Sequence, residues 1–456
     1  MGIAQNQGSA GVPPAIGLEV GTPEARPAGA LSQAEPGAAL CLSGGGFRAT
    51  LYHLGCLIRL NEFGYLSKLK CIVGVSGGAI AAAQLACKWH CLGFNNEGQA
   101  SKLIKEVVDP LRVFCCRLID LCAIGEGFLP FYTVGEALAR RYDRHLFKKK
   151  MLAGVPQDGG QHRQPPRFIF LSTNFQTGSG VQFRKDRIED QRVGVYERPD
   201  IPLSAAVAAA SAFPPMLSPF ALKGLDPKAW KPIEDTEDPL HKLPDYYEPS
   251  RKKLILTDGG VFDNFGVTPV LDKKDMYNPI LVSDAAGPTP DWDKPRRDWP
   301  GQLVKLFFLS NNIKREVRRN LLVEHYFKNP ATHQGGTLWR IGTRSYPYGC
   351  GDALSSDPGL LAHVAATRTR LNPFSPTEQG YLINTGYAFC DAAMRKFVLH
   401  GTPTPEPRLP LPDYPLDDEP PQGLRRWMGG IWKYIKLWQS PCFIEEQVIK
   451  NNFECG

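Results

Sequence analysis

Residues 69–89, LKCIVGVSGGAIAAAQLACKW, decide the fold of this 456-residue chain. The first seven residues form an apolar run with the length of a buried strand, and the alanine-rich second half predicts a helix. A turn of glycines and one serine joins them. Residues 38–64 repeat this arrangement, with an apolar run, three glycines, a helical pattern and Gly64 as its stop. Strand, helix, strand and helix in this order predict βαβ units and a parallel sheet.

Three later apolar runs, at 167–173, 253–258 and 279–285, predict further strands of the same sheet. Capping boxes predict helices that begin after Thr133 and after Ser375. We predict three parts along the chain: a disordered leader over 1–36, one α/β domain over 37–400, and a proline-rich linker with a tryptophan-rich tail over 401–456. The domain is expected to contain a helical insertion at about 96–165 and a loop at 222–252.

The composition narrows the class of protein. A net charge of +7 without a long basic block argues against a nucleic-acid partner. The 12 cysteines include no CxxC pair, so we expect no metal site, and scattered thiols favour a reducing, cytoplasmic location. No apolar stretch has the length of a membrane-spanning helix.

The tail segment 425–439 leaves two interpretations open. A helix here would place Trp427, Ile431, Ile435 and Trp438 on one face and lysines on the other. Such a helix could lie in a membrane interface, which would give peripheral membrane association. It could equally dock on the domain through its tryptophans.

Three short stretches carry the candidate chemistry. In LSGGGFRA (42–49), consecutive glycines between a strand and a helix can direct backbone N–H groups at an anion, either a phosphate or the oxyanion of an acyl transfer. GVSGG (74–78) fits the G-x-S-x-G elbow, which exposes Ser76 as a nucleophile; the alternative is an ordinary small-residue turn. Asp258 ends a predicted strand before two glycines, as a base for the serine or as a turn-forming Asp-Gly.

Other candidates for the base are weaker. His53, His325 and His363 fall within predicted helices, where we interpret them as surface or core residues. Asp284 also ends a predicted strand and is the rival of Asp258, which we prefer because glycines leave room beside its carboxylate.

Oxyanion glycines, an elbow serine and a strand-end aspartate in this order resemble the patatin-like phospholipase family, in particular its bacterial-type lipid acyl hydrolases. The resemblance runs from about 38 to 284 and includes FLSTNFQTGSGVQF (170–183) and AAVAAASAFPPM (205–216). It implies a three-layer α/β/α fold around a central, mostly parallel sheet. This chain departs from the family pattern at Ser43, where the family usually has Asp, and at Ala49, where it has Gly.

The resemblance also implies roles for single residues. Ser76 matches the nucleophile, Asp258 its partner in a Ser–Asp dyad, Gly44, Gly45 and Gly46 the oxyanion hole, and Arg48 the basic residue after it. Gly77 is expected to add one more N–H to that hole. Arg48 could bind a lipid phosphate or anchor the glycine loop.

The function that follows is hydrolysis of carboxylic esters in glycerolipids, with a lipid or membrane-surface substrate and no cofactor. One alternative is a signal-regulated effector on the same fold, with conditional or absent hydrolysis. Another is a phosphate- or nucleotide-binding domain, which would leave Ser76 and Asp258 unexplained.

Overall fold

The structure is a computed structural model, and it describes residues 37–127, 133–156, 165–233, 247–271, 276–288, 298–328, 335–343, 354 and 356–417. The chain divides into two compact units, residues 1–35 and 36–456, and all described residues belong to the second. The predicted leader (1–36) and the predicted tail helix (425–439) lie outside the described residues.

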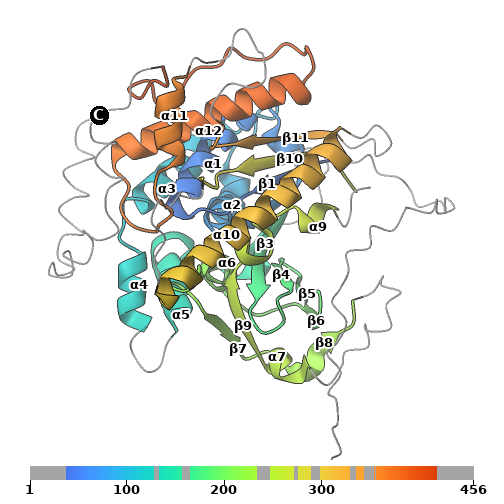
Figure 1. Ribbon diagram of the computed structural model, residues 1–456. Helices are drawn as coiled ribbons and strands as arrows, with labels where there is room; N and C mark the ends of the chain where they lie inside the picture. Colours follow the sequence, from blue (N-terminus) through green and yellow to red (C-terminus); the bar gives the residue numbers. More distant parts are fainter. Residues whose placement is uncertain are drawn as a thin grey trace, which may run out of the picture. The chain divides into compact units, whose positions relative to one another are not determined.

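One eleven-stranded sheet forms the centre of the second unit (Figure 1). Its strands are β1 (Gly37–Leu42), β2 (Leu69–Val75), β3 (Arg167–Asn174), β4 (Gly180–Phe183), β5 (Arg187–Asp190), β6 (Gly194–Glu197), β7 (Phe220–Lys223), β8 (Trp230–Lys231), β9 (Lys253–Asp258), β10 (Tyr277–Asp284) and β11 (Gly336–Arg340). β11, β10, β1, β2 and β3 are parallel neighbours in that order. β4, β5, β6 and β8 continue the sheet with antiparallel pairing, and β9 pairs antiparallel with both β3 and β7.

Helices cover both faces of this sheet. They are α1 (Gly46–Glu62), α2 (Gly77–Lys88), α3 (Asp109–Phe114), α4 (Asp120–Gly127), α5 (Val134–Tyr142), α6 (Leu203–Ser211), α7 (Glu248–Lys252), α8 (Gly260–Asp263), α9 (Thr268–Leu271), α10 (Trp299–Asn320), α11 (Pro358–Ala365) and α12 (Pro376–Phe397). Within the described ranges, three π-helical segments are η3 (Ile104–Val108), η4 (Asp143–Phe147) and η10 (Leu321–Phe327), and short 3₁₀ turns lie at Leu66–Lys68, Trp89–Cys91, Leu152–Gly154 and Pro227–Ala229. Both predicted capping boxes are present, at the starts of α5 and α12.

The central strands separate two hydrophobic layers because successive side chains of a strand point to opposite faces. Leu40, Ile72 and Phe170 join the larger core, which contains residues of α1, α2, α6 and α12. Their neighbours on β1 and β2, Cys41 and Val73, join a smaller core on the other face with residues around α9 and Leu322 of η10. The predicted α/β fold in three layers is therefore confirmed.

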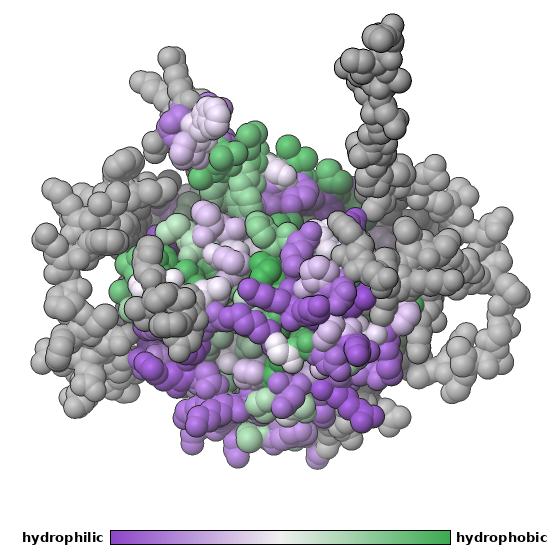
Figure 2. All heavy atoms as spheres, turned by 90° about the horizontal axis from the view of Figure 1, so that it is seen from below, coloured by the Kyte–Doolittle hydropathy of each residue, from purple (hydrophilic) through white to green (hydrophobic). Residues whose placement is uncertain are grey.

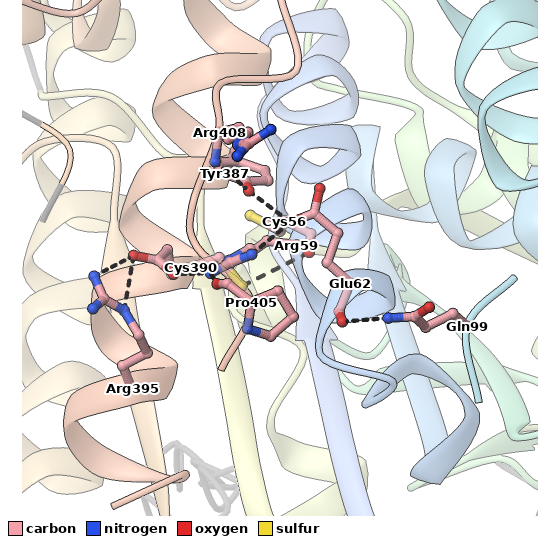
Figure 3. A network of polar contacts seen from close by, with 10 residues as sticks. Cys56, Arg59, Glu62, Gln99, Tyr387, Cys390, Arg395, Pro405 and Arg408 are labelled. Carbon is pink, nitrogen blue, oxygen red and sulfur yellow. Dashed lines mark hydrogen bonds and ion pairs between the residues drawn. The ribbon is translucent and has the colours of Figure 1, made fainter. Parts of the chain in front are cut away.

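Buried charge fixes the contact between α1 and α12 (Figure 3). The fully buried Arg59 donates two hydrogen bonds to Asp391 Oδ1, at 2.8 Å from Nε and 2.7 Å from Nη2. Its Nη1 reaches Glu62, whose carboxylate also accepts the hydroxyl of Tyr387 at 2.6 Å. Each buried charge here has a partner, as burial of an ion pair requires.

Two predictions differ from the structure in detail. The strand at 253–258 is present as β9 but runs antiparallel to β3, because it enters the sheet from the opposite end. The described part of the predicted linker, 402–417, packs on α12: Asn384 Nδ2 donates to the carbonyls of Leu411 and Tyr414, both at 2.7 Å, and Leu416 is buried. Among the described helices, none is long and apolar enough to cross a membrane.

Candidate active site

The register of β3 brings the ends of two other strands together. β2 pairs with β3 in parallel as far as the pair Val75–Leu171. Directly beyond it, β9 pairs with β3 in antiparallel, at Asp258–Ser172. Because β4 occupies the other edge of β3 at these residues, β2 and β9 meet end to end on one edge. Ser76, which follows Val75, therefore lies next to Asp258.

Ser76 has the backbone conformation of a sharp elbow. Its φ of 51° and ψ of −120° are rare for a residue with a Cβ, and it directly precedes α2. The backbone N–H of Ser76 donates to the carbonyl of Ala210 at 3.0 Å, which holds the strained residue in place. Only 7% of Ser76 is exposed. The strand, the positive-φ serine and the helix thus form the predicted turn, and strained backbone of this kind is found at functional sites.

The glycine loop between β1 and α1 packs directly on this elbow. A Cβ on Gly44 would lie 3.1 Å from the Cβ of Ser76 and 2.6 Å from Asn264 Oδ1. A Cβ on Gly77 would lie 2.0 Å from the carbonyl oxygen of Gly46. Side chains at these positions would force the two segments apart, so the glycines are needed for their close contact.

The backbone N–H groups around Ser76 fall into two classes. Those of Gly45, Gly46 and Gly77 donate no hydrogen bond to another described residue, so they remain able to bind an anion. Gly44 differs, because its N–H donates to the carbonyl of Asn264 at 3.2 Å. The N–H of Gly44 is therefore already engaged, and Gly44 allows the close contact with Ser76; its predicted place in the oxyanion hole stays a prediction.

Asp258 is a buried carboxylic acid with few hydrogen bonds. Its Oδ1 accepts the N–H of Gly260 at 2.7 Å, and its Oδ2 has no partner of normal geometry among the described residues. Burial raises the pKa of Asp258 to about 6, while the Ser76 hydroxyl and the Gly260 N–H act in the opposite direction. Asp258 is thus ionised at neutral pH and accepts protons more readily than an ordinary aspartate.

The end of α6 links the two strand ends that carry Ser76 and Asp258. The carbonyl of Ala210 accepts the N–H of Ser76 and, at 3.2 Å, the N–H of Gly259; the carbonyl of Ala212 accepts the N–H of Asp258 at 2.9 Å. Sequence reasoning assigned 205–216 to the site by resemblance, but it missed these carbonyls and missed Asn264. Carbonyl contacts leave no mark on residue type, and the only signal for Asn264 was its position just beyond DGG.

Arg48 binds two backbone carbonyls. Its Nε donates to the carbonyl of Ala285 at 3.1 Å, and its Nη1 to the carbonyl of Thr367 at 2.6 Å. Burial, together with repulsion from Arg315, lowers the pKa of Arg48 to about 10, so it stays charged at neutral pH. Of the two predicted roles, the structure favours the anchor over the phosphate ligand.

The rival bases lie elsewhere. His53 is buried with both ring nitrogens engaged, Nε2 with the carbonyl of Ser43 and Nδ1 with the Ser283 hydroxyl, each at 2.9 Å. His363 is on α11, where Nδ1 contacts the carbonyl of Gly359, and the side chain of His325 lies outside the described part. Asp284 ends β10, beyond β1 from β2, and forms an ion pair with Arg340. Of these acids and bases, Asp258 is the one beside Ser76.

No cluster of three or more His, Cys, Asp or Glu side chains that could hold an ion occurs in the described ranges. The nine described cysteines are free thiols, and five of them are buried: Cys41, Cys56, Cys71, Cys115 and Cys390.

Comparison with known proteins gives one sequence match and several weak structural ones. Residues 40–271, just over half of the chain, match the family model described as patatin-like phospholipase. A comparison with curated proteins gave no match. Among solved structures, human GIVD cytosolic phospholipase A2 is similar with a TM-score of 0.47 and 13% identity, over 79% of this chain and 59% of that one. VipD from Legionella pneumophila has a TM-score of 0.33 and 13% identity, over 79% of this chain and 67% of that one. The chain thus spans less than two thirds of the human phospholipase.

Proposed function

The chain belongs to the patatin-like phospholipase family, and we propose that it hydrolyses carboxylic esters of glycerolipids through Ser76 and Asp258. The observation that carries this proposal is the register on β3, which sets the elbow serine against a buried carboxylate. Ser76 lacks a histidine partner among the described residues, so Asp258 is the group that can take its proton.

In the first half-reaction, Asp258 accepts the hydroxyl proton of Ser76 as Oγ attacks the acyl carbonyl carbon. The N–H groups of Gly45, Gly46 and Gly77, which donate to no other described residue, stabilise the negative charge on the carbonyl oxygen. One such donor typically lowers the barrier by roughly 3–4 kcal/mol. Asp258 then gives its proton to the departing alcohol, and an acyl ester on Ser76 remains.

In the second half-reaction, water attacks the acyl ester and Asp258 accepts one of its protons. The bond between the acyl carbon and Ser76 Oγ then breaks, Asp258 returns the proton to Oγ, and the carboxylic acid is released. The pKa of about 6 suits both steps. A base is most effective when its pKa is near the working pH, because it is then largely ionised and still binds a proton well.

A fluorophosphonate probe tests the proposal, because it labels only an activated serine. We expect labelling of the wild type and none of Ser76→Ala, while Asp258→Asn slows labelling and hydrolysis of a water-soluble butyrate ester by ~100-fold or more. Asp284→Asn is the matched control, since it changes the rival strand-end carboxylate in the same way. Strong labelling of Ser76→Ala, or loss of activity in Asp284→Asn with normal activity in Asp258→Asn, would refute the assignment.

A further inference from the structure

Helix α10 presents its apolar residues to solvent. Six side chains spaced three, four or seven residues apart share one helical face that continues into η10, and 40–82% of each is exposed. These residues are Trp299, Leu303, Leu306, Ile313, Val317 and Leu321, and we call them the α10 ridge. Figure 2 views the molecule from below, so the front of Figure 1, where α10 lies, is at the upper edge of this view. Hydrophobic residues gather along that edge. A surface helix normally turns this face to the core, so the orientation of α10 is reversed.

The polar side of α10 holds the helix on the domain. Lys314 Nζ donates to the carbonyl of Val261 at 2.7 Å, and Arg318 Nη1 to the carbonyl of Phe262 at 3.1 Å. Arg318 also forms an ion pair with the buried Asp263, and Arg315 donates to the carbonyl of Gly287. These contacts fix which side of the helix faces outward, so the exposure of the ridge is determined by the fold.

The ridge lies beside the candidate active site. Val261 and Phe262, which hold α10, directly follow Asp258 and its two glycines. About two turns before Lys314, the ring of Phe307 contacts that of Phe213, in the loop after α6, with 5.7 Å between centroids. α10 thus touches both segments that position Asp258.

We propose that the α10 ridge docks the protein on an anionic lipid bilayer. This rests on the proposed function, because a glycerolipid hydrolase must bring its active site to a lipid surface. An apolar face flanked by basic side chains is the pattern of a helix lying in a membrane interface. α10 carries five basic residues, Lys305, Lys314, Arg315, Arg318 and Arg319. Arg318 and Arg319 form ion pairs with Asp263 and Glu316, whereas the described contacts of Lys314 and Arg315 are with neutral groups, so these two keep a net positive charge next to the ridge.

The same charges argue against protein occupants. Two copies of α10 pairing through their ridges would bring basic side chains together, without the acidic partners that a helix pair uses for specificity. The basic tail 425–439, which contains no acidic residue, would meet the same repulsion. An anionic bilayer supplies both an apolar interior and opposite charge.

The test uses vesicles of phosphatidylcholine with phosphatidylserine, and the full chain carrying Ser76→Ala so that hydrolysis cannot change the surface. We expect this protein to co-sediment with the vesicles, and the added triple change Leu303→Ser, Ile313→Ser and Val317→Ser to weaken binding on the order of 100-fold. The control triple Ile104→Ser, Phe175→Ser and Phe397→Ser removes similarly exposed apolar side chains in other elements and should change binding less than about threefold. Circular dichroism verifies the fold of each variant.

Three results would overturn the proposal. They are no binding by the parent, equal binding by the ridge variant, and an equal loss in the control triple. A parent that self-associates in sedimentation while the ridge variant is monomeric would assign the ridge to a second copy instead. Because binding is measured without catalysis, its failure stays separate from a failure of the probe and ester experiments above.

Discussion

Replacing Asp258 with asparagine should stabilise the protein while it removes activity. The pKa of this buried carboxyl is raised from 3.8 to about 6 because burial disfavours its charge. A shift of about two pKa units corresponds to about 3 kcal/mol between the two protonation states. The folded protein therefore holds the neutral form more tightly than the unfolded chain does. The contribution of this carboxyl to the free energy of unfolding is fully present below pH 4 and is lost as the pH rises through 6. Asparagine stays neutral and can still accept the N–H of Gly260.

We therefore expect Asp258→Asn to have a higher free energy of unfolding than the wild type at pH 7. The difference between the two proteins should be about 3 kcal/mol larger at pH 7 than at pH 4. Urea denaturation of both proteins at the two pH values measures this, and contributions from other titrating groups cancel in the comparison. Comparing two pH values also removes any constant difference in packing between the two side chains. A stability difference that is the same at both pH values would refute the claim that burial raises this pKa.

Three further predictions use other features of the site and core. In the wild type, kcat/KM for a soluble ester should rise about tenfold per pH unit up to pH 6 and then level off, because Asp258 must be ionised to accept a proton; a profile that is flat from pH 4 to 8 would contradict this. Gly77→Ala should lower ester hydrolysis ~100-fold or more, because its Cβ would lie 2.0 Å from the Gly46 carbonyl, whereas Gly125→Ala, with no neighbour within 4 Å, should keep wild-type rates. Asp391→Asn should lower the free energy of unfolding by about 3–5 kcal/mol, because it leaves the charge of the fully buried Arg59 without its main partner; a thermal melt that matches the wild type would rule this out.

Local patterns were enough to predict the elbow and the strands β1, β2, β3, β9 and β10. The runs at 69–75 and 253–258 became β2 and β9 with the predicted bounds, because apolar runs between turn residues mark buried strands wherever they pair. The direction of β9 could not be predicted, since it depends on pairing with β3, whose residues lie far away in the sequence. The proximity of Ser76 and Asp258 came from resemblance, and the structure supplies its physical reason in the register of β3.

Other features of the site depend on three-dimensional contacts that residue type does not encode. One such contact is the hydrogen bond from the Gly44 N–H to the carbonyl of Asn264. Another is the pair of hydrogen bonds that Arg48 donates to backbone carbonyls. The orientation of α10 is another case. Its amphipathic pattern would predict an inward apolar face, and the contacts of its basic side chains with Val261, Phe262, Asp263 and Gly287 explain the reversal.

The carbonyl of Ala210 has a consequence for how the site can change over time. Because one oxygen accepts the N–H groups of both Ser76 and Gly259, these two segments share a single attachment point. A motion of the outer layers that leaves α6 in place cannot alter the spacing between nucleophile and base. A shift at the end of α6 would release both together. Activity should therefore be lost in one step when α6 loosens, and amide exchange at Ser76 and Gly259 should follow the same opening event.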